Sequence, residues 1–317
     1  MDERDAGTPY HEPVLGREVL DLLDLLELGR GGLFLDGTVG GGGHARMLLE
    51  RCGACRLLAV DRDAAALAHA RRVLDPYRDR VRFLHARFDH AVDDVEVKDL
   101  GLAGALLDLG VSSHQLDDRE RGFTYREGAA LDMRMDPAQG GETAADLLAS
   151  ADEGELAAIF RDLAEEPRAR KLAREVVRRR ARAAFATSDD LVNALAGALG
   201  RAPTHPEKAR VFQALRIRVN DELEALTAAL DGIREALVPG GVVAVIAYHS
   251  LEDRIVKQAF REWSRECLCP VDFPVCRCRG RALGETLTRR PVNPSPAEVE
   301  RNPRARSAHL RAWRKAA

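Results

Sequence analysis

The sequence predicts an α/β fold in which a mostly parallel sheet is interrupted by an inserted helical domain. Short apolar runs alternate with helical patterns, which is the βα rhythm of a parallel sheet. Four such runs precede residue 110, but the next one, GVVAVIAY at 241–248, comes some 130 residues later. That gap is too long for a single crossover, so a separate domain is expected within it.

The first part of the sheet is predicted from one helix and four strands. Residues 14–28 form a helical stripe of apolar side chains. This stripe consists of Leu15, Val19, Leu22, Leu23 and Leu26. The strands are expected at Leu33–Leu35, Leu57–Val60, Val81–Leu84 and Ala105–Leu109.

The insertion is expected at 113–205, which leaves 1–112 and 206–317 for the sheet domain. Ser150 and Glu153 have the spacing of a capping box. Ser188 can cap a later helix, which Gly200 then ends.

The chain after the insertion is expected to complete the sheet. A long helical pattern from Glu207 leads through VPGG to the fifth strand, and another helix is expected at 252–266. A short strand near Leu287 and a last strand, SAHLRAW, follow. A strand that arrives this late is typical of an antiparallel edge on a parallel sheet.

Composition places the chain among globular cytoplasmic proteins. Its 317 residues are 45% hydrophobic, and no apolar run approaches the roughly 20 residues of a membrane span. The polar N-terminus has no signal-peptide core, so no membrane partner is expected. Cys52 and Cys55 are interpreted as ordinary thiols of a reducing compartment.

The charge is distributed unevenly. The formal net charge is −3, yet 168–182 holds eight Arg or Lys and one Glu, and 301–315 holds six basic residues and no acid. Each run is either a solvated face or a phosphate-binding surface. Together they favour a polyanionic partner.

A glycine-rich loop, FLDGTVGGGGHA at 34–45, indicates a ligand site. Gly40, Gly42 and Ala45 fit the dinucleotide fingerprint G-x-G-x-x-G/A. Such glycines allow a close approach to a ligand, and the next helix offers unpaired N–H groups.

Further residues are expected at the same edge of the sheet. Asp61 ends the second strand, where it either accepts ribose hydroxyls or caps a helix. Phe88 follows the third strand, as an adenine platform or as core. Asp108 ends the fourth strand, with Gln115 shortly beyond it. Their meeting at the carboxyl ends of the strands indicates a cofactor site.

Several longer motifs resemble the MraW (RsmH) family of S-adenosylmethionine-dependent 16S rRNA N4-cytosine methyltransferases. They are HEPVL, DGTVGGGGH, LLDLGVSS-Q-DD-RGF, LDMRMD, FQALRI-VN-EL, YHSLEDR-VK and NPRARSA-LR. The resemblance implies a class I, Rossmann-like fold with a seven-stranded sheet, and an insertion that recognises RNA. It also implies methylation of a cytidine in the decoding region, with 16S rRNA in the small ribosomal subunit as partner. The implied cofactor contacts are Gly42, Gly43, His44, Asp61, Phe88, Asp108 and Gln115, with His114 where the family commonly has Pro.

The chemistry requires an acceptor for the hydrogens of cytosine N4, because that nitrogen is a weak nucleophile. Asp108 is the first candidate, and His249 is the second. Ser250, Glu252 and Asp253 either face the same site or cap and complement a helix.

Other residues are candidates for contact with RNA. Asp132, Arg134 and Asp136 of LDMRMD are candidates for phosphate binding. Phe123 and Tyr125 either stack on a splayed cytosine or pack in the core. Gln213, Arg216 and Asn220 share a helical face that is RNA-facing or merely solvated.

A second cysteine group comprises Cys267, Cys269, Cys276 and Cys278. It is a candidate structural zinc site, and the alternatives are four thiols or a redox-labile pair.

Two rival functions are a nicotinamide dehydrogenase, which explains the glycine loop, and a non-catalytic RNA-binding protein, which explains the basic runs. The sequence leaves open whether the protein is a monomer or a homodimer.

Overall fold

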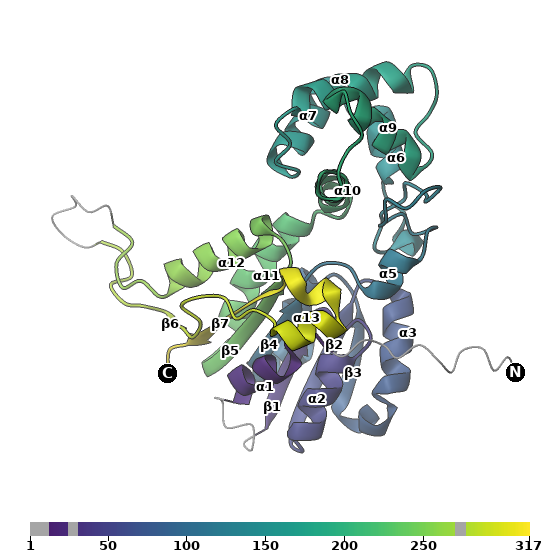
Figure 1. Ribbon diagram of the computed structural model, residues 1–317. Coiled ribbons are helices and arrows are strands. Elements are labelled where there is room, and N and C mark those ends of the chain that lie inside the picture. The colour runs from purple at the N-terminus through teal and green to yellow at the C-terminus, as the bar shows by residue number, and fades with distance from the viewer. Residues whose placement is uncertain (1–12, 25–30, 270–276) are drawn as a thin grey trace, which may run out of the picture. The chain divides into compact units, whose positions relative to one another are not determined.

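The computed structural model describes residues 13–24, 31–269 and 277–317, which fold into two compact units (Figure 1). The sheet unit comprises the described residues as far as Gly110 together with Leu223–Ala317, and the helical unit is Val111–Glu222. The observed insertion thus extends beyond residue 205. The reason is that α10 (His205–Asn220) contributes to the core of the helical unit with Val211, Phe212, Ala214 and Leu215.

The sheet confirms the predicted fold class. Across the described residues it has seven strands in the order β3-β2-β1-β4-β5-β7-β6. They are β1 (Gly32–Asp36), β2 (Cys55–Asp61), β3 (Val81–His85), β4 (Leu102–Asp108), β5 (Leu237–Ala247), β6 (Gly284–Thr286) and β7 (His309–Lys315). Strands β1 to β5 pair in parallel, and β7 is antiparallel to both of its neighbours.

Two details of the sheet differ from the prediction. The last strand is not at the edge, because β7 lies between β5 and the short β6. Strand β5 also begins earlier than expected, at Leu237, so VPGG lies within the strand. Its pairing with β4 has an irregularity between Leu102 and Gly104, where this segment joins the ladder.

Both faces of the sheet are covered by helices, as the continuous apolar runs predict. Phe34 packs on one face, and its neighbours Leu33 and Leu35 pack on the other. The first face is covered by α1 (Gly16–Asp24), α2 (Gly43–Arg51) and α3 (Ala64–Val73). The second is covered by α4 (Val95–Leu100), α11 (Glu222–Ala236) and α12 (Ser250–Trp263). Helix α13 (Pro296–Arg301) precedes β7.

The helical unit has its own apolar core. Its helices are α5 (Ser113–Asp117), α6 (Ala144–Ser150), α7 (Glu153–Asp162), α8 (Ala169–Arg180), α9 (Ser188–Leu199) and α10. Two predicted caps were wrong. Ser150 ends α6, and Asp152 caps α7 by accepting the Glu155 N–H. Thr187 forms the capping box of α9 with Asp190, while Gly200 ends that helix as expected.

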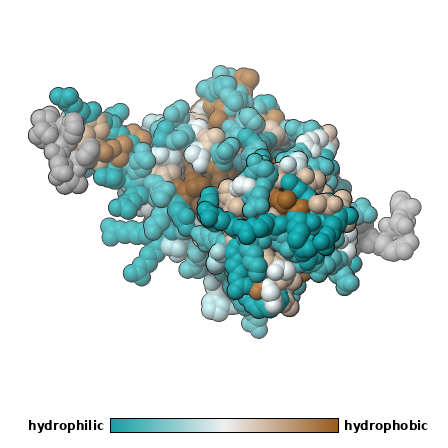
Figure 2. Space-filling view, turned by 90° about the horizontal axis from the view of Figure 1, so that it is seen from above, coloured by the Kyte–Doolittle hydropathy of each residue, from teal (hydrophilic) through white to brown (hydrophobic). Residues whose placement is uncertain are grey.

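The surface is largely hydrophilic on the face seen in Figure 2. Among the described residues the exposed large hydrophobic side chains are Val95 and Leu100. No helix in the described part of the chain is long and apolar enough to cross a membrane.

The expectation of two ordinary thiols at Cys52 and Cys55 was wrong. The structure joins them in a disulfide between the end of α2 and the start of β2, and both are buried. Arg80 donates from Nη1 to the carbonyl oxygens of both cysteines, at 2.6 and 3.3 Å.

Candidate functional site

The glycine loop between β1 and α2 is attached to three strand ends of the sheet unit. The Thr38 N–H donates to Asp36 Oδ1 at 3.2 Å, at the end of β1. The Gly40 N–H donates to Asp61 Oδ2 at 2.8 Å, at the end of β2. The Asp108 N–H donates to Thr38 Oγ1 at 2.6 Å, at the end of β4. The loop therefore brings three carboxylates to one edge of the sheet.

Two positions in this loop require glycine. Gly40 and Gly42 have φ values of 50° and 81°, in the left-handed region that other residues rarely adopt. Gly42 is the N-cap of α2, and no side chain caps that helix start. The first N–H groups of α2, at Gly43 and His44, therefore offer a partial positive charge to a ligand.

The three carboxyl groups have raised pKa values. The pKa of Asp36 is raised from 3.8 to about 7, chiefly by burial and also by the charges of Asp108 and Asp61, against one backbone hydrogen bond from Thr38. Burial raises the pKa of Asp61 to about 6, although it accepts backbone hydrogen bonds. Burial also raises the pKa of Asp108. A cationic ligand would relieve this accumulation of negative charge.

Two ring-bearing side chains face Asp108. The Tyr248 hydroxyl donates to Asp108 Oδ1 at 2.9 Å, and His44 Nδ1 lies 3.7 Å from Oδ2. His44 Nε2 bonds to the Val14 carbonyl at 2.9 Å, and since a carbonyl only accepts, Nε2 carries a hydrogen. His44 is thus oriented within the protein, with its second nitrogen facing the carboxylate.

Tyr248 is a site residue that the sequence reasoning missed. Burial raises its pKa well above 10, with the Asp108 charge adding to the effect, so its hydroxyl keeps its hydrogen and donates. The sequence signal was only that Tyr248 follows the fifth apolar run; in the structure Ile246 pairs with Asp108, and Tyr248 is two residues further on, where side chains return to the same face.

The remaining predicted cofactor contacts lie in different units. Phe88 is half-buried at the end of β3, next to Gly37, where a Cβ would lie 3.2 Å from the Phe88 Cβ. Gln115 belongs to the helical unit and is buried; its Oε1 accepts the Ser112 N–H at 2.9 Å. Both stay predictions as ligand contacts.

The YHSLEDR segment begins α12, and His249 is the residue that caps it. His249 Nδ1 accepts the Glu252 N–H at 3.4 Å, so the hydrogen of a neutral ring is on Nε2, which lies 3.1 Å from Glu252 Oε1. Glu252 is 2% exposed and accepts the Tyr248 N–H. Neither ring nitrogen of His249 then offers a lone pair to a substrate. Ser250, which we considered as the cap, is instead the exposed first residue of the helix.

Asp253 is used inside the sheet unit. Its carboxylate forms a two-pronged ion pair with Arg311 of β7, at 2.6 and 2.9 Å. Burial opposes ionisation, but Arg311 holds the pKa of Asp253 below its usual value. This pair fastens α12 to β7, which is a structural role.

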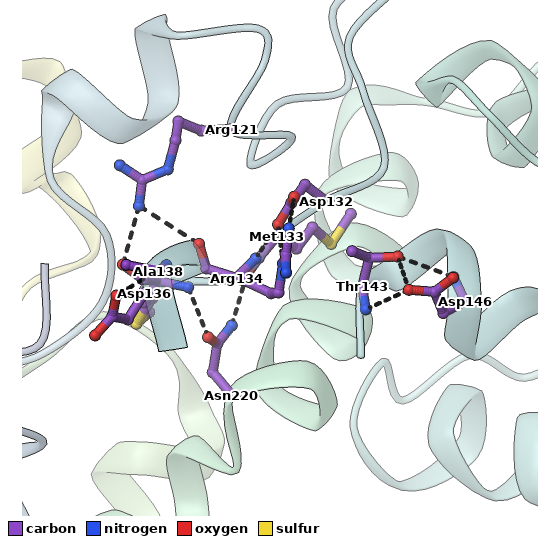
Figure 3. A network of polar contacts seen from close by, with 10 residues as sticks. Arg121, Asp132, Met133, Arg134, Asp136, Ala138, Thr143, Asp146 and Asn220 are labelled. Atoms are coloured by element: carbon purple, nitrogen blue, oxygen red, sulfur yellow. Dashed lines mark hydrogen bonds and ion pairs between the residues drawn. The ribbon is translucent and has the colours of Figure 1, made fainter. Parts of the chain in front are cut away.

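The LDMRMD motif forms a polar network in the helical unit (Figure 3). Arg134 and Asp132 pair side by side, at 2.9 and 2.6 Å. The Asn220 amide accepts the Met135 N–H at 2.9 Å and donates to the Met133 carbonyl at 2.7 Å. Asn220 is 2% exposed, so it holds this loop from within and does not face a solvent-borne partner.

Other candidates of the helical unit are also engaged within it. Asp136 is buried and caps a short 3-10 helix by accepting the Ala138 N–H. Arg216 pairs with Glu222 through two hydrogen bonds of 2.8 Å. Phe123 is buried in the helical core, whereas Tyr125 is partly exposed beside it.

Comparisons with known proteins agree with the motifs. A family model described as "MraW methylase family" matches residues 8–316. A protein of Gemmatimonas aurantiaca called ribosomal RNA small subunit methyltransferase H is 50% identical, over 98% of this chain and 96% of its own length. One of the same name from Heliobacterium modesticaldum is 49% identical, over 96% and 98%.

Among solved structures, an rRNA methylase of Streptococcus thermophilus has a TM-score of 0.42 and 10% identity, covering 94% of this chain and 95% of that one. The sequence matches extend over almost the whole chain and include the glycine loop and the strand ends that form the site. The chain belongs to the MraW methylase family.

Proposed function

We propose that this protein transfers a methyl group from S-adenosylmethionine to N4 of a cytidine in the decoding region of 16S rRNA. The observation that carries the proposal is the group of three carboxyl groups with raised pKa values beside the glycine loop, in a member of a methylase family. The relatives' name, ribosomal RNA small subunit methyltransferase, supports the choice of RNA.

The residues present fit the cofactor. Its sulfonium and amino groups are positive, which suits Asp36, Asp61 and Asp108, and its carboxylate suits the uncapped start of α2. Phe88 and Gln115 are proposed to complete the contacts, with Asp61 on the ribose and Phe88 on the adenine. When bound, the sulfonium supplies an already activated methyl group.

Asp108 is proposed to accept a hydrogen from the cytosine amino group. A carboxylate whose pKa is raised by burial is a stronger base than an ordinary aspartate. The Tyr248 hydroxyl fixes the direction of one of its oxygens, and His44 Nδ1 lies 3.7 Å from the other. His249 is the weaker candidate, because its Nδ1 accepts the Glu252 N–H and its Nε2 is buried 3.1 Å from the Glu252 carboxylate.

RNA binding is proposed for the helical unit, with a narrower basic surface than the whole run 168–182. Arg168 and Arg180 donate to backbone carbonyls at the ends of α9 and α6. Arg178 and Arg179 pair with Glu175. Within the described residues, Arg170, Lys171 and Arg182 are exposed and have no ion pair, so these three are the proposed phosphate contacts.

The second basic run supports RNA binding less. Arg311 pairs with Asp253, Arg314 lies 3.5 Å from Glu285, and Lys315 donates to the carbonyls of Glu235 and Leu237. These side chains stabilise β7 and its neighbours.

The test of the reaction uses Asp108→Asn, which keeps the shape of the side chain and removes its charge. We expect the variant to fold, by thermal melting and circular dichroism, and to lose methyl transfer to small-subunit rRNA. Turnover at the wild-type rate would exclude Asp108 as the acceptor. The ligand is tested by thermal shift with S-adenosylmethionine, S-adenosylhomocysteine and NAD. Stabilisation by NAD alone would favour a dehydrogenase, and by none of them a binding protein.

The RNA surface is tested with R170E/K171E/R182E. We expect weaker binding and a shallower dependence of affinity on salt, since fewer counterions are released. The control R72E/R78E/K98E changes the net charge equally at exposed positions of the sheet unit. Equal losses in the two triple variants would show that only net charge matters and would contradict the assignment.

A further inference from the structure

Three cysteine sulfurs gather in the segment between α12 and β6. Cys267 and Cys269 follow the end of α12, and Cys278 returns from the other side of the turn. Their Sγ atoms all lie within 4.8 Å of one another. Cys276, the fourth cysteine of the motif, lies outside the described residues.

The spacing of these sulfurs matches a metal site and not a disulfide. The Sγ atoms of Cys278 and Cys267 are 3.8 Å apart. A zinc–sulfur bond of about 2.3 Å in a tetrahedron separates two sulfurs by about 3.8 Å, whereas a disulfide bond is about 2.05 Å long. The Cys267 and Cys278 sulfurs are thus already at the separation of two zinc ligands, and the Cys269 sulfur lies within 4.8 Å of both.

Two of the sulfurs accept hydrogen bonds from the backbone of the same segment. The Leu268 N–H donates to Cys278 Sγ at 3.2 Å, and the Arg277 N–H donates to Cys269 Sγ at 3.4 Å. Contacts of this kind around a ligand atom orient it and are characteristic of the surroundings of metal ligands. Four arginines, at 265, 277, 279 and 281, add positive charge nearby in the sequence.

The described parts of this segment contribute no buried side chain to an apolar core. None of the described residues in 264–269 and 277–282 is fully buried. The described residues after α12 and before β6 are joined by hydrogen bonds. The Leu283 N–H donates to the Trp263 carbonyl, and Arg279 donates to the carbonyls of Glu262 and Arg265. A metal ion supplies a further restraint in small cysteine-rich turns.

We propose that Cys267, Cys269 and Cys278 bind a structural Zn²⁺ ion that fixes the segment between α12 and β6. The ion is redox-inert, and its ligands release their protons on binding. The segment joins α12 to β6, the edge strand that β5 and β7 separate from β4, so the role proposed for the ion is structural and not catalytic.

The test measures zinc in the full chain, purified under reductant and passed through a desalting column with a weak chelator. We expect about one zinc per chain in the wild type and none in C267S/C269S/C278S. The control C52S/C55S removes the other cysteine pair and is expected to keep its zinc. A wild type that stays zinc-free after reconstitution under reductant, or a triple variant that retains the metal, would overturn the proposal.

A second measurement does not depend on any variant. Cobalt replaces zinc in the wild-type protein, and thiolate ligands then produce strong charge-transfer absorption in the near ultraviolet, which added zinc removes. Absence of these bands would overturn thiolate ligation. Trypsin gives a further readout, since chelation should speed cleavage at Arg277 and Arg279, and an unchanged cleavage rate would contradict the structural role.

Discussion

Replacing Asp36 with asparagine tests the electrostatics of the site most directly. Asp36 is 3% exposed, and a small, mostly apolar cavity lined by Val19, Leu20 and Phe34 lies against it. An ionised carboxylate in such surroundings loses hydration, and the charges of Asp61 and Asp108 repel it. Asparagine keeps the shape and removes the ionisation.

The magnitude follows from the shift in pKa. The folded protein holds the Asp36 proton up to about pH 7, whereas the unfolded chain releases it near 3.8. Between these values the folded state binds more protons, so the free energy of unfolding falls as the pH rises and levels off above pH 7. Each pKa unit corresponds to about 1.4 kcal/mol, so the full shift lowers the free energy of unfolding by about 4 kcal/mol. Between pH 5 and pH 8 the free energy of unfolding falls by about 3 kcal/mol.

The assay is urea unfolding of wild type and D36N without cofactor at pH 5, 6, 7 and 8. The D36N protein should gain stability relative to wild type by about 3 kcal/mol from pH 5 to pH 8. Any pH-independent effect of the substitution cancels in this comparison. The exposed Asp99→Asn is the control and should follow the wild-type curve. Parallel curves for D36N and wild type would refute the reasoning.

Three further predictions concern the site and its supports. Affinity for S-adenosylmethionine should rise with pH between 5.5 and 8, by up to about tenfold per pH unit for each proton displaced, and more steeply than for S-adenosylhomocysteine, which lacks the sulfonium charge; calorimetry that gives equal slopes would contradict this. Y248F should slow methyl transfer by about tenfold or more, because a hydrogen bond to a charged group contributes about 1.5–3 kcal/mol. The acid limb of the pH–rate profile of Y248F should move to higher pH, because the lost donor had lowered the pKa of Asp108. An unshifted profile would count against this role of Tyr248. N220A should destabilise the protein by about 2–3 kcal/mol, because it leaves the Met135 N–H and the Met133 carbonyl buried without their side-chain partner; an unfolding curve like that of R218A would show the amide to be unimportant.

The strands were predictable because the sheet is buried on both faces. Leu57–Val60 is a short apolar run with few other interpretations, and it lies within β2. The caps were less predictable, since Thr187 and Ser188 are adjacent and have similar capping side chains. The backbone conformation at Thr187 selects it, and Ser188 donates to the Arg126 carbonyl instead. Neighbouring polar residues of this kind differ only in tertiary contacts.

Site residues were predictable by position and less so by role. Asp108 and Asp61 lie at strand ends, so the order of strands brings them together. The role of Tyr248 depends on the register between β4 and β5, which no local pattern specifies. Asn220 has the helical spacing of a surface residue, yet the loop at 133–135 packs over it. Side-chain periodicity gives a face of a helix, and only packing decides what covers that face.

The glycine fingerprint is therefore best interpreted together with the charge around it. A dinucleotide brings a doubly negative pyrophosphate to the loop, next to the start of the following helix. Here the same loop is hydrogen-bonded to Asp36 and Asp61, and Asp108 lies at the third strand end. Pyrophosphate at this position would be repelled by each carboxylate that ionises, and protonating all three would require a pH below the pKa of about 6 of Asp61. A sulfonium cofactor has the opposite sign and is attracted by the same three groups, so the charge at the strand ends distinguishes the two ligands where the glycine spacing does not.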